Sequence, residues 1–220
     1  MADTPIPAPP EPAVTRLSLY LRHLEELRAD GVVTISSTRI GSAVGCSAAQ
    51  VRKDLGYFGQ FGRRGVGYPV EDLAASLRHI LGTHRLWPTA LVGVGNLGSA
   101  LLAYEGFKRR GFMISCAFDN DPQKIGRVIN SVLIRDVAEF SSAVCERGIR
   151  LGIIAVGART AQTVVDMMIR AGIEGILNFA PTQVRVPDTV VLYAEDLAIR
   201  LEQITYHLMR RGAAETSSSP

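Results

Sequence analysis

The sequence predicts a two-part α/β protein, in which a helical N-terminal region precedes a Rossmann-like, doubly wound parallel sheet. Residues 13–84 show helical apolar periodicity, whereas beyond them short apolar runs alternate with helical patterns. Such alternation is typical of parallel strands joined by right-handed helical crossovers. A glycine-rich turn, Gly93–Gly98, follows the first of these apolar runs and favours the same fold.

Length and composition limit the class of protein. The chain has 220 residues, of which 47% are hydrophobic, and this is enough for one or two domains with a real core. Because no uncharged apolar run reaches about 18 residues, we expect no membrane-spanning helix. Residues 1–12 contain five prolines and no apolar segment of the signal-peptide kind, and we expect them to form a disordered lead.

Cysteine usage and overall charge give weaker indications. Cys46, Cys116 and Cys145 are scattered and form no C-x-x-C pair, which favours reduced thiols in a cytoplasmic protein and no metal site. The net charge of +3 is too small to identify a nucleic-acid-binding protein. Any basic surface therefore has to be local.

The N-terminal region, residues 13–84, has the sequence outline of a winged helix-turn-helix domain. Apolar stripes predict helices at residues 14–30, 38–44, 48–58 and 70–81. A serine precedes each of the two short helices as an N-cap, Ser36 or Ser37 in one case and Ser47 in the other. The glycine-rich stretch 56–68 is expected to form a tight hairpin or wing.

Basic residues cluster in this region. Between residues 36 and 68 there are five of them against one acidic residue. Four residues of the second short helix lie off its apolar face and are expected to point outward, namely Gln50, Arg52, Lys53 and Asp54. Glutamine suits the adenine edge in a major groove, and arginine or lysine suits guanine. The residues expected to contact DNA are Ser47, Gln50, Arg52, Lys53, Tyr57, Arg63 and Arg64. The alternative is a small helical domain with a solvated basic face.

Residues 85–194 are expected to form the Rossmann-like domain. Its strands are predicted at residues 91–94, 113–118, 132–134, 151–156, 175–179 and 190–193. Its helices are predicted at residues 96–109, 137–147 and 160–171. In such sheets a ligand binds outside the carboxyl ends of the strands, so the loops that follow the strands are the candidate site.

The turn after the first strand fits the dinucleotide-binding pattern G-x-G-x-x-G. Gly93 allows the tight turn, Gly95 lets backbone approach a pyrophosphate, and Gly98 lets the helix pack on the strand. Asp119, at the end of the next strand, is placed to hold a ribose diol and to disfavour a 2′-phosphate. The residues expected to bind the cofactor are Gly93, Val94, Gly95, Asn96, Leu97, Gly98, Asp119, Asp121, Gly157, Ala158, Asn178 and Phe179.

The sequence shows no pattern of catalytic residues to accompany this glycine-rich turn. The four histidines lie outside residues 85–194, and there is no H-x-x-x-H, C-x-x-C or Ser/His/Asp arrangement. We therefore expect no catalytic residue and no metal. A dinucleotide domain fused to a DNA-reading domain is better explained as a ligand sensor than as an enzyme.

A last apolar stripe predicts a helix over residues 195–211, after the sheet is complete. This helix can pack on its own sheet, or it can embrace another subunit, because a terminal helix is easily exchanged between protomers. Residues 212–220 are small and polar, and we expect a disordered tail.

Five motifs occur in order along the chain: Gln50–Gly59, Phe61–Tyr68, Val92–Gly98, Phe118–Pro122 and Gly175–Pro181. Together, and in register from about Arg16 to Tyr206, they resemble the Rex family of bacterial redox-sensing transcriptional repressors. The resemblance implies a cytoplasmic homodimer whose winged-helix domains bind an inverted-repeat operator of respiratory or fermentative genes. NADH releases that DNA, whereas NAD+ competes for the same site and leaves the DNA-binding form in place.

The resemblance also implies roles for single residues. Arg52 and Lys53 read the operator, and the last helix is domain-swapped between the two subunits. Arg22, Tyr104 and Asp196 match a switch set that links the DNA-binding domain, the nucleotide pocket and the swapped helix.

Other classes compete with this interpretation. An NAD-dependent oxidoreductase and a CoA-binding enzyme subunit use the same fold, and an Asn-Phe-Ala-Pro loop like Asn178–Pro181 occurs among CoA-binding domains. A plain DNA-binding protein with a vestigial nucleotide fold is a third possibility. Asp119 favours a ribose diol over CoA, and the lack of a base near the pocket argues against a dehydrogenase.

Overall fold

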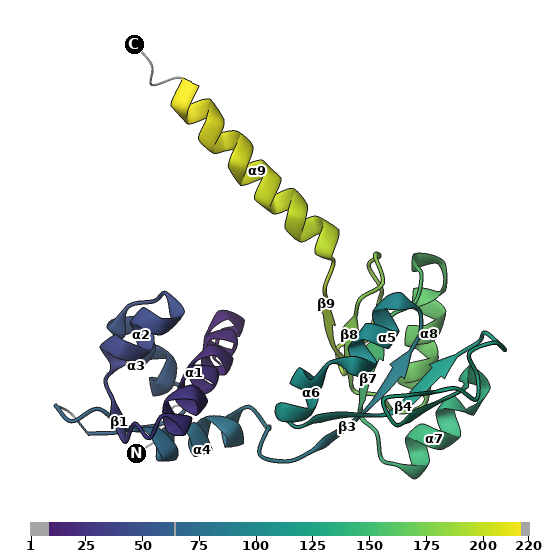
Figure 1. Cartoon of the computed structure of the whole chain (residues 1–220), viewed down its shortest axis with the longest axis horizontal. Helices are drawn as coiled ribbons and strands as arrows, with labels where there is room; N and C mark the ends of the chain where they lie inside the picture. Colours follow the sequence, from purple (N-terminus) through teal and green to yellow (C-terminus); the bar gives the residue numbers. More distant parts are fainter. Residues whose placement is uncertain (1–8, 64, 217–220) are drawn as a thin grey trace. The chain divides into compact units, whose positions relative to one another are not determined.

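A computed structural model describes residues 9–63 and 65–216, and side chains up to residue 210. Residues 1–8 of the expected lead, Arg64 of the expected wing and residues 217–220 of the expected tail lie outside the described residues. The chain forms two compact units, residues 1–85 and 86–220 (Figure 1).

The N-terminal unit contains four helices and a short antiparallel strand pair within its described residues. Its helices are α1 (Glu11–Ala29), α2 (Ser37–Val44), α3 (Ala48–Gly56) and α4 (Val70–Ile80), and its strands are β1 (Thr34–Ile35) and β2 (Tyr68–Pro69). Apolar stripes from all four helices meet in one core, which includes Leu17, Leu24, Leu55, Leu73 and Leu77.

Helix boundaries in this unit follow the capping residues. Ser36 and Ser47 accept hydrogen bonds from the backbone N–H of Arg39 and Gln50, at 3.2 and 3.1 Å, so Ser36 rather than Ser37 caps α2. Helix α1 begins at Glu11, inside the stretch expected to be a disordered lead. Prolines at its start are compatible with this, because the first N–H groups of a helix have no intrahelical partner.

The expected wing is a tight hairpin closed by Arg63 and Gly67, which exchange backbone hydrogen bonds of 3.0 Å. Its second arm continues into β2, which pairs with β1. Strand β1 was not predicted, because a strand of two residues carries no detectable period.

The second unit is a seven-stranded sheet with helices between the strands. Its strands are β3 (Trp87–Val92), β4 (Phe112–Asp119), β5 (Val128–Ile129), β6 (Val132–Asp136), β7 (Leu151–Ile154), β8 (Gly175–Asn178) and β9 (Val191–Ala194). The order is β5-β6-β4-β3-β7-β8-β9, and every neighbouring pair is parallel except β5 with β6. The strand order reverses between β3 and β7, and this is the point where doubly wound sheets bind ligands.

The helices that lie between its strands are α5 (Asn96–Ala103), α6 (Glu105–Arg109), α7 (Phe140–Glu146, after a 3-10 turn at Val137–Glu139) and α8 (Ala158–Arg170). The prediction of a single helix over residues 96–109 is therefore wrong. The chain breaks at Tyr104, whose ψ of 97° is extended, and the Tyr104 ring occupies the space where a Cβ on Gly106 would lie. Tyr104 also packs edge-on against Phe107 at 5.1 Å between ring centroids.

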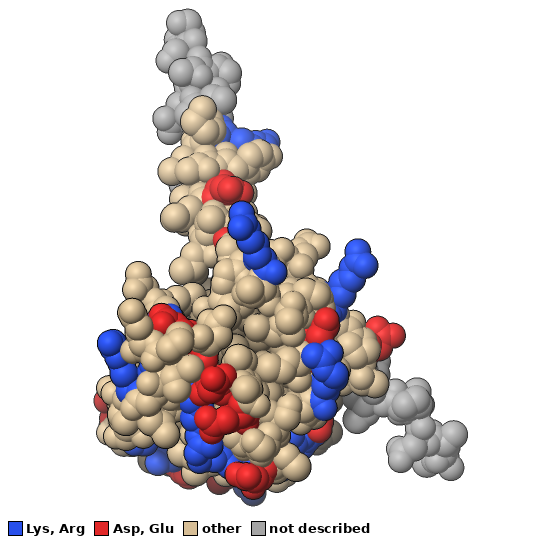
Figure 2. Space-filling view, turned by 90° about the vertical axis from the view of Figure 1, so that its right-hand side faces the viewer, with Lys and Arg blue, Asp and Glu red and all other residues tan. Residues whose placement is uncertain are grey.

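Helix α9 (Leu197–Thr216) extends beyond the expected 195–211, so residues 212–216 continue a helix instead of joining a tail. The stretch Ala213–Glu215 consists of good helix formers, which explains the extension. On the face of α9 that Figure 2 shows, uncharged residues predominate between a few charged side chains. Its apolar stripe is more than half exposed, at Leu197, Leu201, Ile204 and Leu208.

None of the helices within the described residues is both long enough and apolar enough to cross a membrane.

Candidate functional site

The glycine loop between β3 and α5 has the three geometries that a phosphate cradle needs. Gly93 has a φ of +96°, and a Cβ there would meet the carbonyl group of Ala155 in the loop after β7. A Cβ on Gly98 would overlap the carbonyl oxygen of Gly93. Beyond Gly95 itself and its two neighbours in the chain, no described atom lies within 4 Å of a Cβ added at Gly95. The fold thus requires Gly93 and Gly98, whereas the space beside Gly95 is open to a ligand at the N-terminus of α5.

Asp119 ends β4 next to this loop, as the sequence predicts. The side chain is 7% exposed and accepts hydrogen bonds from the backbone N–H of Val94 (2.8 Å) and of Asp121 (3.0 Å). Lys124 contributes an ion pair to the same carboxylate, with Nζ 3.0 Å from Oδ2. Burial alone would raise the pKa of Asp119, but the two N–H groups and Lys124 outweigh it and lower the pKa.

The carboxylate of Asp119 is not saturated by these partners. Oδ2 accepts from Val94 and Lys124, whereas Oδ1 accepts only from Asp121 among the described residues. Since each carboxylate oxygen takes about two hydrogen bonds, Oδ1 keeps one acceptor position for a hydroxyl. The sequence interpretation missed Lys124; its position five residues after Asp119 was the available signal.

The loops after β7 and β8 lie at the same sheet edge. Gly157 is the N-cap of α8 and Ala158 is its first residue, so their backbone borders the cradle. Asn178 was expected to bind the cofactor, and its side chain makes its hydrogen bonds within its own loop. It is fully buried, donates to the carbonyl of Thr182 (3.1 Å) and accepts from the N–H of Ala180 (2.9 Å). Its side chain shapes the loop and has no free face for a ligand, while Phe179 beside it is half-buried.

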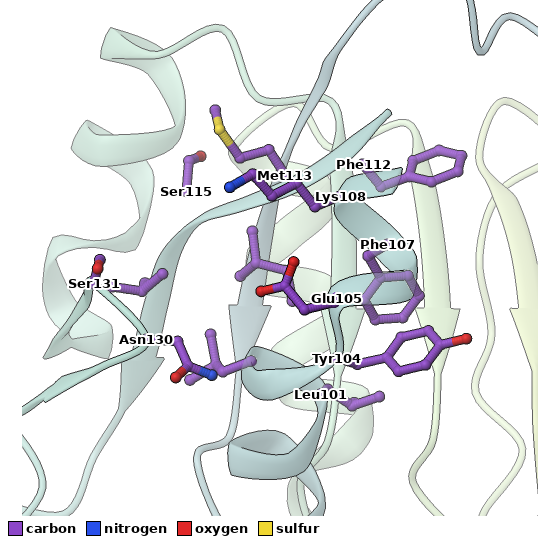
Figure 3. Close-up of a pocket in the computed structure, with 13 residues that line it drawn as sticks. Leu101, Tyr104, Glu105, Phe107, Lys108, Phe112, Met113, Ser115, Asn130 and Ser131 are labelled. Atoms are coloured by element: carbon purple, nitrogen blue, oxygen red, sulfur yellow. The ribbon is translucent and has the colours of Figure 1, made fainter. Parts of the chain in front are cut away.

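A separate cavity of about 300 Å³ lies at the amino end of β4, the opposite end from Asp119 (Figure 3). It is lined by residues of α5, α6, β4 and the β5–β6 turn, including Tyr104, Lys108, Met113 and Ser115. Because dinucleotides bind at carboxyl ends of strands, this cavity is not the expected nucleotide site.

The candidate DNA surface is the outer side of α3 together with the hairpin. Arg52 and Lys53 are exposed, and Arg52 donates to the hydroxyl of Ser37 (3.0 Å), which ties α3 to the start of α2. Arg63 is exposed at the hairpin, and Tyr57 follows α3 as its C-cap. The charges therefore lie on one helix face and the neighbouring turn, as a groove-reading helix requires.

The position of Asp54 contradicts the prediction from the sequence. It was expected to point outward with Gln50, Arg52 and Lys53, but it is fully buried between α3 and α1. Arg16 reaches it with two hydrogen bonds of 2.6 and 2.7 Å. An acidic residue at a flanking helical position can turn inward when a partly buried arginine lies opposite, and the lone acid of a basic stretch was the missed signal.

The three residues implied as a switch are distributed over both units. Arg22 is exposed on α1, and Tyr104 is exposed between α5 and α6. Asp196 precedes α9 and accepts from the N–H groups of Ala198 (2.9 Å) and Ile199 (3.4 Å), so it caps that helix. Their link across the units remains a prediction.

No cluster of three or more potential metal ligands exists among the residues that the structure covers. The three cysteines are free thiols, and Cys116 is buried.

Two family descriptions match parts of the chain. Residues 9–56 match "Putative DNA-binding protein N-terminus", and residues 84–182 match "CoA binding domain". The first match covers α1 to α3, and the second covers the sheet up to the loop after β8.

Individual proteins match the chain almost from end to end. The redox-sensing transcriptional repressor Rex of Carboxydothermus hydrogenoformans is 48% identical over 201 residues, which is 91% of this chain and 97% of that protein. The crystal structure of RSP, a Rex-family repressor, in complex with β-NAD+ and operator DNA matches with a TM-score of 0.89 and 36% identity. The match covers 94% of this chain and 95% of that chain. The crystal structure of RSP in complex with β-NADH matches with a TM-score of 0.84 and 34% identity, over 95% of this chain and 98% of that chain.

Proposed function

The chain belongs to the Rex family of redox-sensing transcriptional repressors, and we propose that it represses transcription according to the NADH/NAD+ ratio. The observation that carries this proposal is that one chain contains both an exposed basic helix, α3, and a glycine loop with the buried Asp119 beside it. A relative that matches both parts, RSP, binds β-NAD+ and operator DNA together. The family is one of regulators, and we assign the chain no enzymatic activity.

The ligand that fits the cradle is NADH or NAD+. Gly95 leaves room for the pyrophosphate, and the free acceptor position on Asp119 suits one hydroxyl of the adenosine ribose. A 2′-phosphate would place negative charge beside an ionised carboxylate, so NADPH should bind poorly. CoA carries a 3′-phosphate on the same ribose, so the same repulsion acts against the CoA-binding alternative.

The DNA partner is an inverted-repeat operator of respiratory or fermentative genes, read in the cytoplasm by α3 of each subunit. Arg52 and Lys53 are the proposed base-reading cations, with Ser47, Gln50, Tyr57, Arg63 and Arg64 as the further DNA contacts. Two copies of α3 related by a two-fold axis match two half-sites of such an operator.

A homodimer with exchanged α9 helices accounts for the exposed stripe on α9. An isolated helix that exposes Leu201, Ile204 and Leu208 by more than half would leave its apolar area in water. Burying this stripe on a partner subunit removes that area from water. Leu201→Asp combined with Leu208→Asp should therefore give a monomer by light scattering, whereas Glu202→Ala, on another face of α9, should leave the dimer intact.

Redox sensing is tested by nucleotide titration into a fluorescent operator complex followed by anisotropy. NADH should release the DNA, NAD+ should leave it bound, and NADPH should act only at much higher concentration. Calorimetry on the free protein shows whether each nucleotide binds at all. Retention of the operator at saturating, calorimetrically verified NADH would contradict the sensor function.

A further inference from the structure

The carboxylate of Asp54 is a buried and fully partnered group in the DNA-binding unit. It has no solvent exposure and accepts four hydrogen bonds. Arg16 gives two of them, Tyr20 Oη donates to Oδ2 at 2.7 Å, and Gln50 Nε2 donates to Oδ1 at 2.7 Å. All acceptor positions of the carboxylate are thereby filled.

These contacts fix the charge state of the group. Burial alone would raise the pKa of Asp54, but hydrogen bonds from Arg16, Tyr20 and Gln50 lower it. Burial raises the pKa of the Tyr20 hydroxyl, which therefore keeps its proton and donates it. Asp54 is an ionised, acceptor-only group at neutral pH.

An acceptor-only neighbour decides how the amide of Gln50 is oriented. The atom of Gln50 that faces Asp54 has to be the NH₂ group, because a carbonyl oxygen in that place would meet a carboxylate oxygen. The amide nitrogen is thus directed at a fully buried group. Its carbonyl oxygen Oε1 is the end that remains for another partner.

The place of Gln50 on α3 makes that partner a base. Gln50 is the third residue of the helix and lies one turn before Lys53, which is exposed. Its backbone N–H is already satisfied by Ser47, and its side chain bonds to Asp54 instead of returning to cap the helix. In a helix-turn-helix the first turns of the recognition helix contact base edges.

We propose that Gln50 reads the operator as a hydrogen-bond acceptor and that Asp54 is the positioning residue that sets this polarity. Only adenine N6 and cytosine N4 offer an amino donor in the major groove, so Gln50 selects adenine or cytosine against guanine or thymine on the contacted strand. Adenine N7, which a two-point glutamine–adenine pair also uses, is not contacted. The proposal rests on the proposed function, since it needs α3 in the groove.

The first step of the test finds the contacted position. Every base pair of one operator half-site is substituted in turn, and affinities are measured for the wild type and for Gln50→Ala. One position should discriminate about tenfold in the wild type and lose that discrimination in the variant. Failure of the wild type to bind any operator would refute the proposed function, whereas binding with no Gln50-dependent position refutes this proposal alone.

The second step removes single atoms at that position. If the base is adenine, purine in its place lacks the amino group and should weaken wild-type binding about tenfold, whereas 7-deazaadenine lacks N7 and should not. If it is cytosine, 2-pyrimidinone should weaken binding equally. A loss with 7-deazaadenine as large as that with purine would overturn the acceptor assignment.

The third step tests Asp54 as the cause. Asp54→Asn can offer an N–H to Gln50 and let the amide turn, so this variant should lose discrimination at the Gln50 position. Tyr20→Phe keeps the Asp54–Gln50 contact and should retain the wild-type base preference, even if it is less stable. Unchanged base preference in folded Asp54→Asn would refute the positioning role, and the analogue experiment with wild-type protein remains decisive if that variant does not fold.

Discussion

Among its described residues each unit buries one aspartate, and the two carboxylates are used in opposite ways. Asp54 accepts from three side chains on α1 and α3 and has no acceptor position left. Asp119 accepts mainly from backbone N–H groups and keeps one position at the sheet edge. Both have a lowered pKa. A saturated carboxylate joins parts of a fold, whereas an unsaturated one at a strand end is ready to take a ligand.

Removal of Asp54 should give the largest effect on stability. Asp54→Ala leaves Arg16 without its partner at a helix interface, and the free energy of unfolding of the N-terminal unit should fall by about 3–5 kcal/mol. Denaturant unfolding followed by helical circular dichroism measures this. The single tryptophan, Trp87, lies in the other unit, so its fluorescence should follow a transition that the variant leaves unchanged.

A matched control lies in the same unit. Arg28 and Glu71 also join two helices, α1 and α4, but both side chains are about half exposed or more. Glu71→Ala should cost at most about 1 kcal/mol. Equal losses for Asp54→Ala and Glu71→Ala would show that the buried carboxylate does not join the helices as described.

Removal of Asp119 should affect ligand binding more than stability. Asp119→Ala loses a charged acceptor for the ribose, so NADH affinity should fall by about 10- to 100-fold, equivalent to roughly 1.5–3 kcal/mol. Calorimetry measures the affinity, and operator binding without nucleotide serves as the control that should not change. Unaltered NADH affinity would mean that the ribose is held elsewhere.

Gly95 and Gly98 show the same contrast between a residue that binds ligand and a residue that supports the fold, within one loop. Gly98→Ala places a methyl group against the carbonyl oxygen of Gly93 and should destabilise the second unit by about 1–3 kcal/mol. Gly95→Ala has open space and an allowed φ of −82°, so it should fold normally but bind NADH more weakly. Thermal unfolding and calorimetry separate the two outcomes, and a strongly destabilised Gly95→Ala would contradict the open cradle.

The two aspartates also show which features of the structure could be predicted from the sequence. The parallel sheet, the cradle and Asp119 follow from local signals: apolar runs, spaced glycines and an acid at a strand end. The burial of Asp54 depends on Arg16, which is 38 residues away in the chain, and no local period reports such a pair. The contacts of Asn178 within its own loop could not be predicted for a related reason, since a loop-shaping amide and a ligand-binding amide look alike in sequence. The break at Tyr104 depends on packing against Gly106 and Phe107, which helix periodicity does not register.

The pH dependence of stability should separate the two carboxylates with the smallest signal. A folded-state pKa below the ordinary value of about 3.9 means that the stabilisation is complete above that pH and is lost as pH falls toward the folded pKa. Each group can contribute at most about 1.4 kcal/mol per pH unit to that loss. Asn cannot titrate, so Asp54→Asn should flatten the acid limb of the transition seen by circular dichroism, and Asp119→Asn should flatten that seen by Trp87 fluorescence. An acid limb of the N-terminal unit that runs parallel in wild type and Asp54→Asn would show that folding does not lower the pKa of Asp54, and that Arg16 does not stabilise its ionised form.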